Sequence, residues 1–497
     1  MFCKPSAVWK LTFAAALGML PMQTAPAADP LRDSVVHVLV TQRAPNLFQP
    51  WTKATPSEVT GTGFVIEGRR ILTNAHVVGH AHQIYIQPHQ SADRLPATVE
   101  AMAADIDLAV LRLEDESFFD NRQAIAFGDG RPQTKTTVNV YGYPVGGEQM
   151  SVTEGIVSRI DYAPYHYGTG GLRVQIDAAL NPGNSGGPAV TDGKLVGVAF
   201  SGLKQAENIG YLIPVEEVSA FLADAADGHY DGKPRLRDQF QTVENDAIRA
   251  KLGLPAGTGG CMVTRPAETN DSYPLKEGDV VIKVGEHSLD NAGRVQVEGE
   301  LKLPFQYLVP SLTQEGKLPL TVLRDGQSMS VSLPVTSRDR LLVPYLKGGY
   351  PRYFIYGPIV FTPAYRELVV ALGAKWSPYL LDRGHPLVTR LGDDPAFEGE
   401  ELVIIAAPFF SHRLTCGYSQ AMFSVVSSMN DIPVRSLRHL AELLRYTQSE
   451  YIEFKFAGKG TETLVFRRQE IADATEEILN DNGIRKPCSD DLASVWK

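Results

Sequence analysis

Residues 31–215 constrain the fold most, because short β-branched runs there alternate with Gly, Pro and Asn. Typical runs are SVVHVLVTQ, DLAVLRL and KLVGVAFSG. Strands of this length and spacing indicate an antiparallel sandwich or barrel rather than alternating strands and helices. We therefore predict a mainly β unit of two barrel-like sheets. The stretch PVEEVSAFLADAADG, with Val218, Phe221 and Leu222 on one face, predicts a helix that closes this unit.

The chain has 497 residues, which is too long for one hydrophobic core and suggests about three domains. The polar stretch GHYDGKPRLRDQ reads as a linker. The two units after it share one expected order of elements, which is strand, turn, helix and strand. In that order, GDVVIKVGEHSL of the second unit and AMFSVVSSMNDIPV of the third unit take the same position. This weak repeat favours two copies of one binding module. The expected boundaries are a signal peptide at 1–28 and units at 29–228, 236–338 and 342–487.

The N-terminal stretch places Lys4 and Lys10 before a short apolar run and ends in small residues, which is typical of a cleaved secretory signal. An uncleaved anchor and an organelle transit peptide are the alternatives. No later run approaches about 18 apolar residues, so we expect no integral membrane span. We expect an exported protein in a periplasm, with secretion or an organelle lumen as alternatives. The net charge of −10 argues against nucleic acid as a partner.

Cofactor and metal motifs are missing from the sequence. Three cysteines lie beyond the predicted signal, Cys261, Cys416 and Cys488, and they are far apart and lack metal-ligand spacing. We expect free thiols. The chain also lacks a phosphate-binding loop, an HExxH motif and a CxxC pair. We therefore expect neither a cofactor nor a metal.

The stretch DAALNPGNSGGPAV surrounds one hydroxyl, that of Ser185, with unusually permissive backbone. Gly183, Gly186 and Gly187 can adopt conformations that a side chain would forbid. Backbone amides near Ser185 could thus converge on one point, as an oxyanion site requires.

A nucleophilic serine needs a base that accepts its proton and a third group that orients the base. In ILTNAHVV, His76 directly follows an apolar run, and in ADIDLAVLRL, Asp107 stands at the start of another. The order His, Asp, Ser is one of the known orders of the catalytic triad. Asp105 is a rival, because it shares a face with Asp107 in an extended segment. We favour Asp107, since it abuts the apolar run and is better placed for burial against an imidazole.

Several segments together resemble the HtrA/Deg family of trypsin-like serine proteases with PDZ domains. They are GTGFVI, ILTNAHVV, DLAVLRL, VTEGIVSRI, DAALNPGNSGGPAV and IGYLIP. The later segments GGCMVTRP, LKEGDVVIKVGEHSLDNAGRV and the C-terminal stretch are similar to the plant-type Deg branch. The resemblance implies a chymotrypsin-like double β-barrel protease domain followed by two PDZ-like α+β domains, the second of them divergent.

Residue by residue, the resemblance implies that His76 is the general base, Asp107 its orienting acid and Ser185 the nucleophile. The amides of Gly183 and Ser185 match the oxyanion hole.

Leu180 precedes the nucleophile by five residues, and Ile209, Gly210 and Tyr211 resemble the wall of the primary pocket. No acidic residue stands there, so we expect Val, Leu or Ile before the cleaved bond.

The second unit is expected to bind peptides by adding a strand to a sheet edge and capturing a C-terminal carboxylate with backbone amides. The candidate loop is GTGGCMV, with Gly259, Gly260, Cys261 and Met262 as peptide-binding residues. In the third unit, TCGYSQA departs from a clean carboxylate loop. That unit could serve assembly as readily as substrate binding.

The family resemblance implies an ATP-independent serine endopeptidase that acts on unfolded or damaged proteins and forms homo-oligomers, as trimers or multiples of them. The alternative is a chaperone or PDZ peptide-binding scaffold whose protease unit rests inactive.

Overall fold

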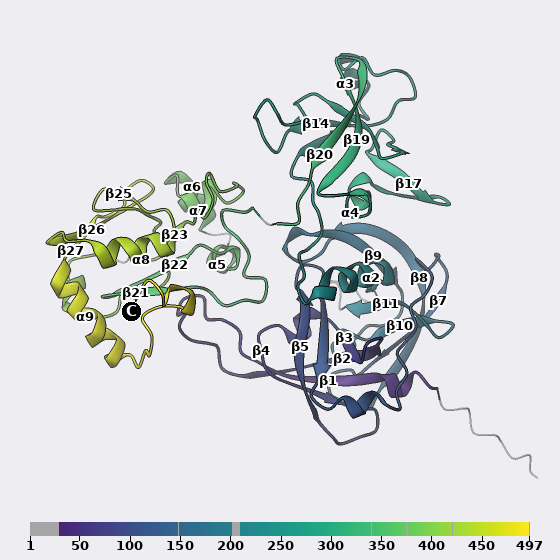
Figure 1. The fold of residues 1–497 in the computed structure, drawn as a ribbon, viewed down its shortest axis with the longest axis horizontal. Coiled ribbons are helices and arrows are strands. Elements are labelled where there is room, and N and C mark those ends of the chain that lie inside the picture. The colour runs from purple at the N-terminus through teal and green to yellow at the C-terminus, as the bar shows by residue number, and fades with distance from the viewer. Residues whose placement is uncertain are drawn as a thin grey trace, which may run out of the picture.

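The computed structural model describes residues 29–147, 149–200, 209–338, 340–373, 376–419 and 421–496, and the expected signal peptide lies outside them. The chain forms three units in sequence order (Figure 1). The purple and blue N-terminal unit lies below the green second unit, and the yellow-green third unit lies to one side. Among the described residues, no helix is long and apolar enough to cross a membrane. Cys261, Cys416 and Cys488 are free, which confirms the expectation of unpaired thiols.

The first half of the N-terminal unit is a closed barrel of antiparallel strands. Each strand contributes buried aliphatic residues, because alternate side chains of a strand point to the barrel interior. In spatial order the strands are β1 (Val35–Gln42), β2 (Ser57–Ile66), β3 (Arg70–Thr73), β6 (Leu108–Leu113), β5 (Leu95–Ala103) and β4 (Ala81–Gln87). One helical turn, α1 (Ala75–Val78), joins β3 to β4.

The second half is another closed barrel, and the prediction of two barrels is confirmed. Its spatial order is β7 (Thr137–Gly142), β8 (Ser151–Pro164), β9 (Gly170–Ile176), β12 (Gly210–Pro214), β11 (Lys194–Phe200) and β10 (Pro188–Thr191). Helix α2 (Val215–Asp224) follows with Val218 and Phe221 buried and Leu222 partly buried, as the sequence predicts. A core cluster that includes Phe64 and Tyr211 joins the two barrels and α2.

The second unit is built on one antiparallel sheet in the order β13-β14-β15-β19-β20, with β16 paired to β15. A separate hairpin and short helices cover the sheet, and Phe305 and Val309 of this cover are buried against it. The elements are β13 (Gln239–Thr242), α3 (Asp246–Lys251), β14 (Cys261–Arg265), β15 (Val280–Val284), β16 (His287–Ser288), β17 (Arg294–Glu298), β18 (Leu301–Pro304), α4 (Val309–Leu312), β19 (Lys317–Arg324) and β20 (Gln327–Pro334).

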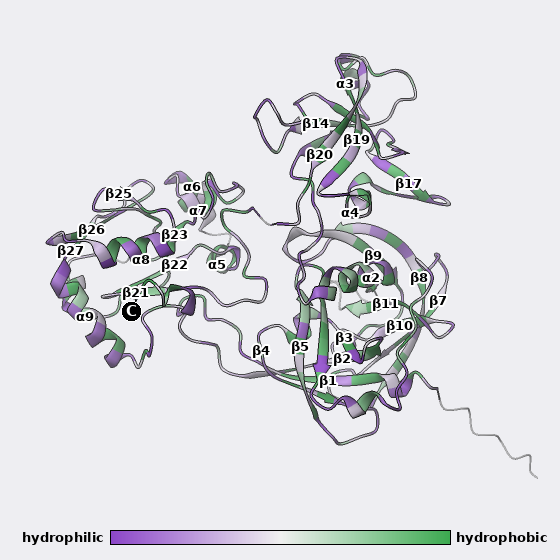
Figure 2. Cartoon of the chain, viewed as in Figure 1, coloured by the Kyte–Doolittle hydropathy of each residue, from purple (hydrophilic) through white to green (hydrophobic). Residues whose placement is uncertain are grey.

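The third unit combines two small sheets, β21-β22-β23 and β25-β24-β26-β27, with helices. Helix α8 carries hydrophobic and hydrophilic residues together, as expected for a helix with one buried face (Figure 2). The elements are β21 (Phe354–Tyr356), β22 (Ile359–Pro363), α5 (Arg366–Leu372), α6 (Ser377–Asp382), α7 (Pro386–Thr389), β23 (Val403–Ile405), β24 (Val426–Met429), β25 (Ile432–Pro433), α8 (Leu437–Tyr446), β26 (Tyr451–Phe456), β27 (Leu464–Arg467) and α9 (Arg468–Asp481).

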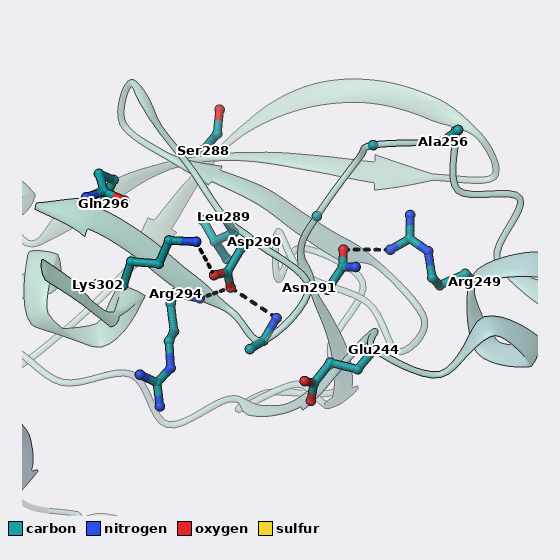
Figure 3. A pocket seen from close by; sticks show the side chains of 13 residues that line it. Glu244, Arg249, Ala256, Ser288, Leu289, Asp290, Asn291, Arg294, Gln296 and Lys302 are labelled. Atoms are coloured by element: carbon teal, nitrogen blue, oxygen red, sulfur yellow. Dashed lines mark hydrogen bonds and ion pairs between the residues drawn. The ribbon is translucent and has the colours of Figure 1, made fainter. Parts of the chain in front are cut away.

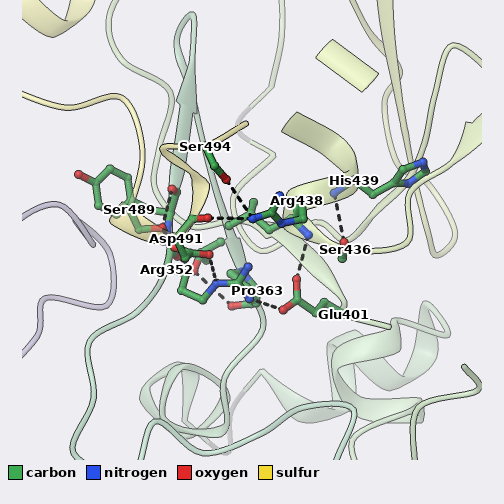
Figure 4. A network of polar contacts seen from close by, with 12 residues as sticks. Arg352, Pro363, Glu401, Ser436, Arg438, His439, Ser489, Asp491 and Ser494 are labelled. Carbon is green, nitrogen blue, oxygen red and sulfur yellow. Dashed lines mark hydrogen bonds and ion pairs between the residues drawn. The ribbon is translucent and has the colours of Figure 1, made fainter. Parts of the chain in front are cut away.

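A polar network ties the two ends of the third unit together (Figure 4). The Arg352 guanidinium donates to the Asp491 carboxylate at 2.7 Å and to Glu401. Glu401 also accepts from the Leu437 amide at 2.9 Å, so the network reaches the first residue of α8. Charge-assisted bonds of this kind hold the C-terminal segment against the segment that enters the unit.

Candidate active site

The segment that carries His76 lies against the segment that carries Asp107. The Asp107 carboxylate accepts from the His76 backbone amide at 2.8 Å and lies 2.7 Å from its ring Nδ1. The Asn74 side-chain amide donates to the Asp107 carbonyl at 2.9 Å. Three contacts therefore join the start of α1 to the turn before β6, and they fix which ring nitrogen of His76 meets the carboxylate.

Asp107 and its rival Asp105 have different surroundings. Asp107 has a φ of 60°, a left-handed conformation that aspartate tolerates better than most side chains do. Its side chain is 1% exposed and points to His76. The Asp105 carboxylate instead accepts from the Thr169 hydroxyl at 3.0 Å. The structure thus places Asp107, and not Asp105, beside the imidazole.

The electrostatics of this pair act on His76 in opposite directions. Burial lowers the pKa of the imidazole, whereas the hydrogen bond and the charge of Asp107 raise it, and the net result is a raised pKa. The side chain remains 43% exposed, so solvent and small molecules reach the ring. An imidazole with one nitrogen on a buried carboxylate and one edge open is suited to proton transfer.

Glycines shape the loop that bears Ser185, as the sequence predicts. Gly183 and Gly186 have φ values of +100° and +86°. A Cβ on Gly183 would lie 2.3 Å from the Tyr143 carbonyl oxygen, and one on Gly186 would lie 2.1 Å from that of Thr62. Only glycine fits at these two positions, because the backbone conformation and the close neighbours both exclude a side chain.

Thr62, in the middle of β2, fastens this loop to the first barrel. Its hydroxyl donates to the Gly183 carbonyl at 2.7 Å and accepts from the Tyr143 amide at 2.9 Å. Its own amide donates to the Ser185 carbonyl at 2.8 Å. Thr62 is thus a residue of the candidate site that the sequence motifs did not predict. The available signal was a polar residue between two glycines, in GTG, within an apolar strand.

The residues of the predicted specificity pocket divide into two groups. Leu180 and Gly210 are neighbours, since a Cβ on Gly210 would lie 2.7 Å from Leu180 Cδ1. Ile209 and Tyr211 pack against the core cluster between the barrels, and Tyr211 is 8% exposed. Leu180 and Gly210 are therefore brought together beside the loop of Ser185, whereas Ile209 and Tyr211 act as supporting packing.

The glycine-rich loop of the second unit departs from its predicted role. The Gly260 amide already donates to the Asp290 carbonyl at 3.0 Å, so it is not available to capture a carboxylate. Cys261 and Met262 lie in β14, which pairs with β13 on one edge and with β15 on the other. Strand addition at β14 is thus prevented. The sheet order makes β13, next to β14, one edge strand of this sheet and β20 the other.

Gly259 lines a cavity of about 750 Å³ that also holds the Asp290 carboxylate. Asp290 accepts from Lys302 at 3.2 Å and from the Arg294 amide at 2.9 Å (Figure 3). These contacts lower the pKa of Asp290 despite its partial burial. The cavity is lined by both signs of charge, with Arg249, Arg294 and Lys302 beside Glu244 and Asp290.

Comparison with known proteins agrees with this architecture. Residues 61–198 match the trypsin-like peptidase domain family, and residues 344–491 match the PDZ domain family. Protease Do-like 2, chloroplastic, from Arabidopsis thaliana is 34% identical over 475 residues, covering 93% of this chain and 76% of the relative. Putative protease Do-like 3, mitochondrial, from the same organism is 31% identical over 472 residues, covering 94% and 82%. The solved structure of HtrA-type protease AlgW with tripeptide has 22% identity and a TM-score of 0.49, covering 62% of this chain and 94% of that one.

The two closed barrels, the PDZ domain and these relatives define a trypsin-like serine endopeptidase. The chain belongs to the HtrA/Deg family of Do-like serine proteases, with plant Deg proteins among its relatives. The fold class and the family expected from the sequence are thereby confirmed. The names of these relatives point to a chloroplast and mitochondria, and they give no support to the periplasm expected above.

Proposed function

We propose that the protein hydrolyses peptide bonds with Ser185 as nucleophile, His76 as general base and Asp107 as the group that orients the base. The double contact of the Asp107 carboxylate with the His76 amide and ring carries this proposal. It holds the proton on Nδ1 and leaves the Nε2 lone pair for the serine hydroxyl.

In the reaction, Ser185 Oγ attacks the carbonyl carbon of the scissile bond while Nε2 of His76 takes the hydroxyl proton. The tetrahedral intermediate collapses when the imidazolium gives that proton to the leaving amine. The resulting acyl-enzyme is hydrolysed by a water molecule, whose proton again passes to Nε2 and then to Ser185. Asp107 remains ionised and stabilises the imidazolium that forms in each half of the reaction.

The amides of Gly183 and Ser185 are the proposed donors to the oxyanion. The Val145 amide donates to the Pro182 carbonyl at 2.8 Å, which fixes the plane of the peptide between Pro182 and Gly183. In a planar trans peptide the N–H points away from the C=O, so the Gly183 N–H faces away from Val145. Such a preorganised donor stabilises the transition state by about 3 to 4 kcal/mol.

The proposed substrates are unfolded or damaged proteins, cleaved after a medium-sized apolar residue. The contact of Leu180 with Gly210 supports this preference, because it forms an apolar wall without a carboxylate. We assign the second unit, 236–338, and the third, 342–487, as PDZ-like domains, and the free edge of β13 as the place where a peptide strand adds to the second. We also propose that the protein forms homo-oligomers and lies in the lumen of an organelle, because the names of its relatives are chloroplastic and mitochondrial.

A serine-directed fluorophosphonate tests the central assignment. Wild type should be labelled at Ser185 and should cleave an unfolded protein. Ser185→Ala and His76→Ala should lose turnover by orders of magnitude, on the order of 10⁶ for the serine in the best-studied case of another fold. Ser158→Ala, which changes an exposed serine of β8, is the matched control and should behave as wild type. Labelling that persists in Ser185→Ala, or that never occurs in wild type even with peptide ligands, would instead favour the inactive scaffold.

A further inference from the structure

Residues 345–350, here called the strap, enter the third unit and lie against the first barrel on their way. The strap is anchored to the third unit, since the Leu346 amide donates to Glu367 Oε1 at 2.9 Å and the Arg366 guanidinium lies 5.3 Å from the ring centroid of Tyr345. A turn from the Gly349 amide to the Leu346 carbonyl, at 2.8 Å, compacts it. Its two ends contact two different segments of the first unit.

The C-terminal end of the strap contacts His80, which follows α1, and Arg43, which follows β1. His80 Nε2 lies 3.1 Å from the Gly349 carbonyl, and its ring packs edge-on against Tyr350 with centroids 5.4 Å apart. The Tyr350 hydroxyl donates to the Arg43 carbonyl at 2.8 Å. The Arg43 amide in turn donates to the His80 carbonyl at 3.0 Å. Arg43, His80 and Tyr350 therefore form a closed cluster.

This cluster adjoins α1, which needs external support. A helix of four residues is too short to be stable through its own hydrogen bonds. Its carbonyls at His76 and Val77 accept from the side-chain amide of Gln42 at 3.0 and 2.9 Å. Gln42 precedes Arg43, and α1 ends two residues before His80. The strap thus contacts Arg43, the neighbour of Gln42, and His80, which lies just after α1.

The N-terminal end of the strap reaches the other side of the His76–Asp107 pair. The ring of Tyr345 lies 4.9 Å, between centroids, from that of Tyr167. Tyr167 has a φ of 57°, a conformation that a bulky residue keeps only when its surroundings hold it. Its neighbour His166 places Nε2 at 3.9 Å from Asp107 Oδ2. The contact therefore supports the loop that adjoins the carboxylate.

We propose that Tyr345 and Tyr350 are positioning residues for the peptidase reaction. By docking on His80, Arg43 and Tyr167, the strap keeps the side chains of His76 and Asp107 in their relative positions. Peptide hydrolysis then requires the third unit to be docked on the protease unit, even for substrates too short to reach a PDZ domain. This inference rests on the proposed function of His76, Asp107 and Ser185.

The test uses the full chain and a short fluorogenic peptide with an apolar residue before the cleaved bond. Tyr345→Ala and Tyr350→Ala should lower kcat about tenfold or more with KM unchanged, because a small misplacement of a catalytic group is costly and the strap touches no substrate. Tyr345→Phe should match wild type, since only the ring makes the contact. Tyr350→Phe keeps its ring contacts and loses one hydrogen bond, so kcat should fall about threefold.

Two controls separate positioning from general damage. Tyr446→Ala alters a tyrosine of the third unit that is 69% exposed, and it should leave kcat unchanged. The low-field imidazole proton resonance, assigned to the His76–Asp107 bond by its loss in His76→Ala, should weaken in the two strap alanine variants and not in Tyr446→Ala.

Wild-type kcat and an intact resonance in Tyr345→Ala and Tyr350→Ala would overturn the inference. If those variants do not fold, a wild-type kcat in Tyr350→Phe would overturn it. Failure of the proposed function is distinguishable, because Ser185→Ala would then retain activity.

Discussion

At the scale of single residues, the proposed chemistry depends on the pair His76 and Asp107. The carboxylate is almost completely buried and has the ring and the amide of His76 as partners, with His166 at 3.9 Å as a further neighbour. A buried carboxylate needs hydrogen-bond donors that compensate its desolvation, and the amide and ring of His76 face it. The same charge raises the pKa of His76 above the ordinary histidine value of 6.5, against the effect of burial. The upward direction of this pKa shift determines the pH dependence that we expect for catalysis.

We predict that kcat/KM falls with decreasing pH along a limb whose midpoint lies above 6.5. The base must be neutral, and a raised pKa means that protonation begins at a higher pH than for an isolated histidine. A pH–rate profile with a short peptide measures the midpoint. Asp107→Asn keeps the shape of the side chain but removes its charge, so its limb should move toward lower pH while its maximal rate drops by about 10⁴. An unmoved limb in Asp107→Asn would show that another group controls the titration.

The sequence reveals single residues of the candidate site where the local backbone permits only one residue type. The glycines around Ser185 are demanded by their own φ values and by carbonyls within 2.5 Å of any added Cβ, so the sequence carries that information. The structure also places Asp107 beside the His76 ring and Asp105 beside Thr169. Thr62 was missed because its partners, Gly183 and Tyr143, are 121 and 81 residues away and become known only with the fold.

At the scale of elements, α8 shows how local signals define a helix of the third unit. Ser436 is its N-cap and accepts from the His439 amide at 3.1 Å, while Leu440 and Leu444 are buried against the sheet. A serine before an apolar periodic run is a typical helix start. The order of elements expected for the third unit includes a helix here, and the structure adds its first residue, Leu437, and its cap.

Ser436→Ala should destabilise α8 by about 1 kcal/mol, because the His439 amide loses its acceptor. Hydrogen exchange of the α8 amides should accelerate about fivefold, which is the factor that corresponds to this free energy at room temperature. Ser436→Thr retains the hydroxyl and serves as the matched control. Equal exchange rates in wild type and Ser436→Ala would mean that tertiary packing alone defines the start of this helix.

The strand of the second unit that was expected to bind a peptide, β14, is paired on both edges, and its sequence could not reveal this. β13 and β14 are both short, and period-two patterns reveal which face of a strand is buried but not which edge is paired. The paired glycines 259 and 260 suggested an anion-binding turn. In the structure they allow close approach instead, since a Cβ on Gly259 would lie 2.1 Å from the Leu289 carbonyl oxygen.

At the scale of the whole molecule, the third unit is joined to the protease unit by aromatic contacts as well as by the strap. Trp51, in the loop between β1 and β2, lies 5.5 Å from Phe410 and 6.5 Å from Tyr353 between ring centroids. In the same loop, Phe48 lies 6.0 Å from Phe423. These partners are about 300 to 375 residues apart, and a surface loop with aromatic residues does not reveal in its sequence what it will contact.

Trp51→Ala should weaken the docking of the third unit by up to about 2 kcal/mol, because the lost ring is only partly buried. Once docking weakens, residues 340–352, which lead into the third unit, should become more sensitive to protease, and the radius of gyration from solution scattering should increase. Trp376→Ala removes a tryptophan of the third unit that is 51% exposed and lies outside this contact, so it is the matched control. If the strap positions His76, Trp51→Ala should also lower kcat on short peptides. If the third unit undocks in Trp51→Ala while kcat stays at the wild-type value, catalysis does not require docking of this unit.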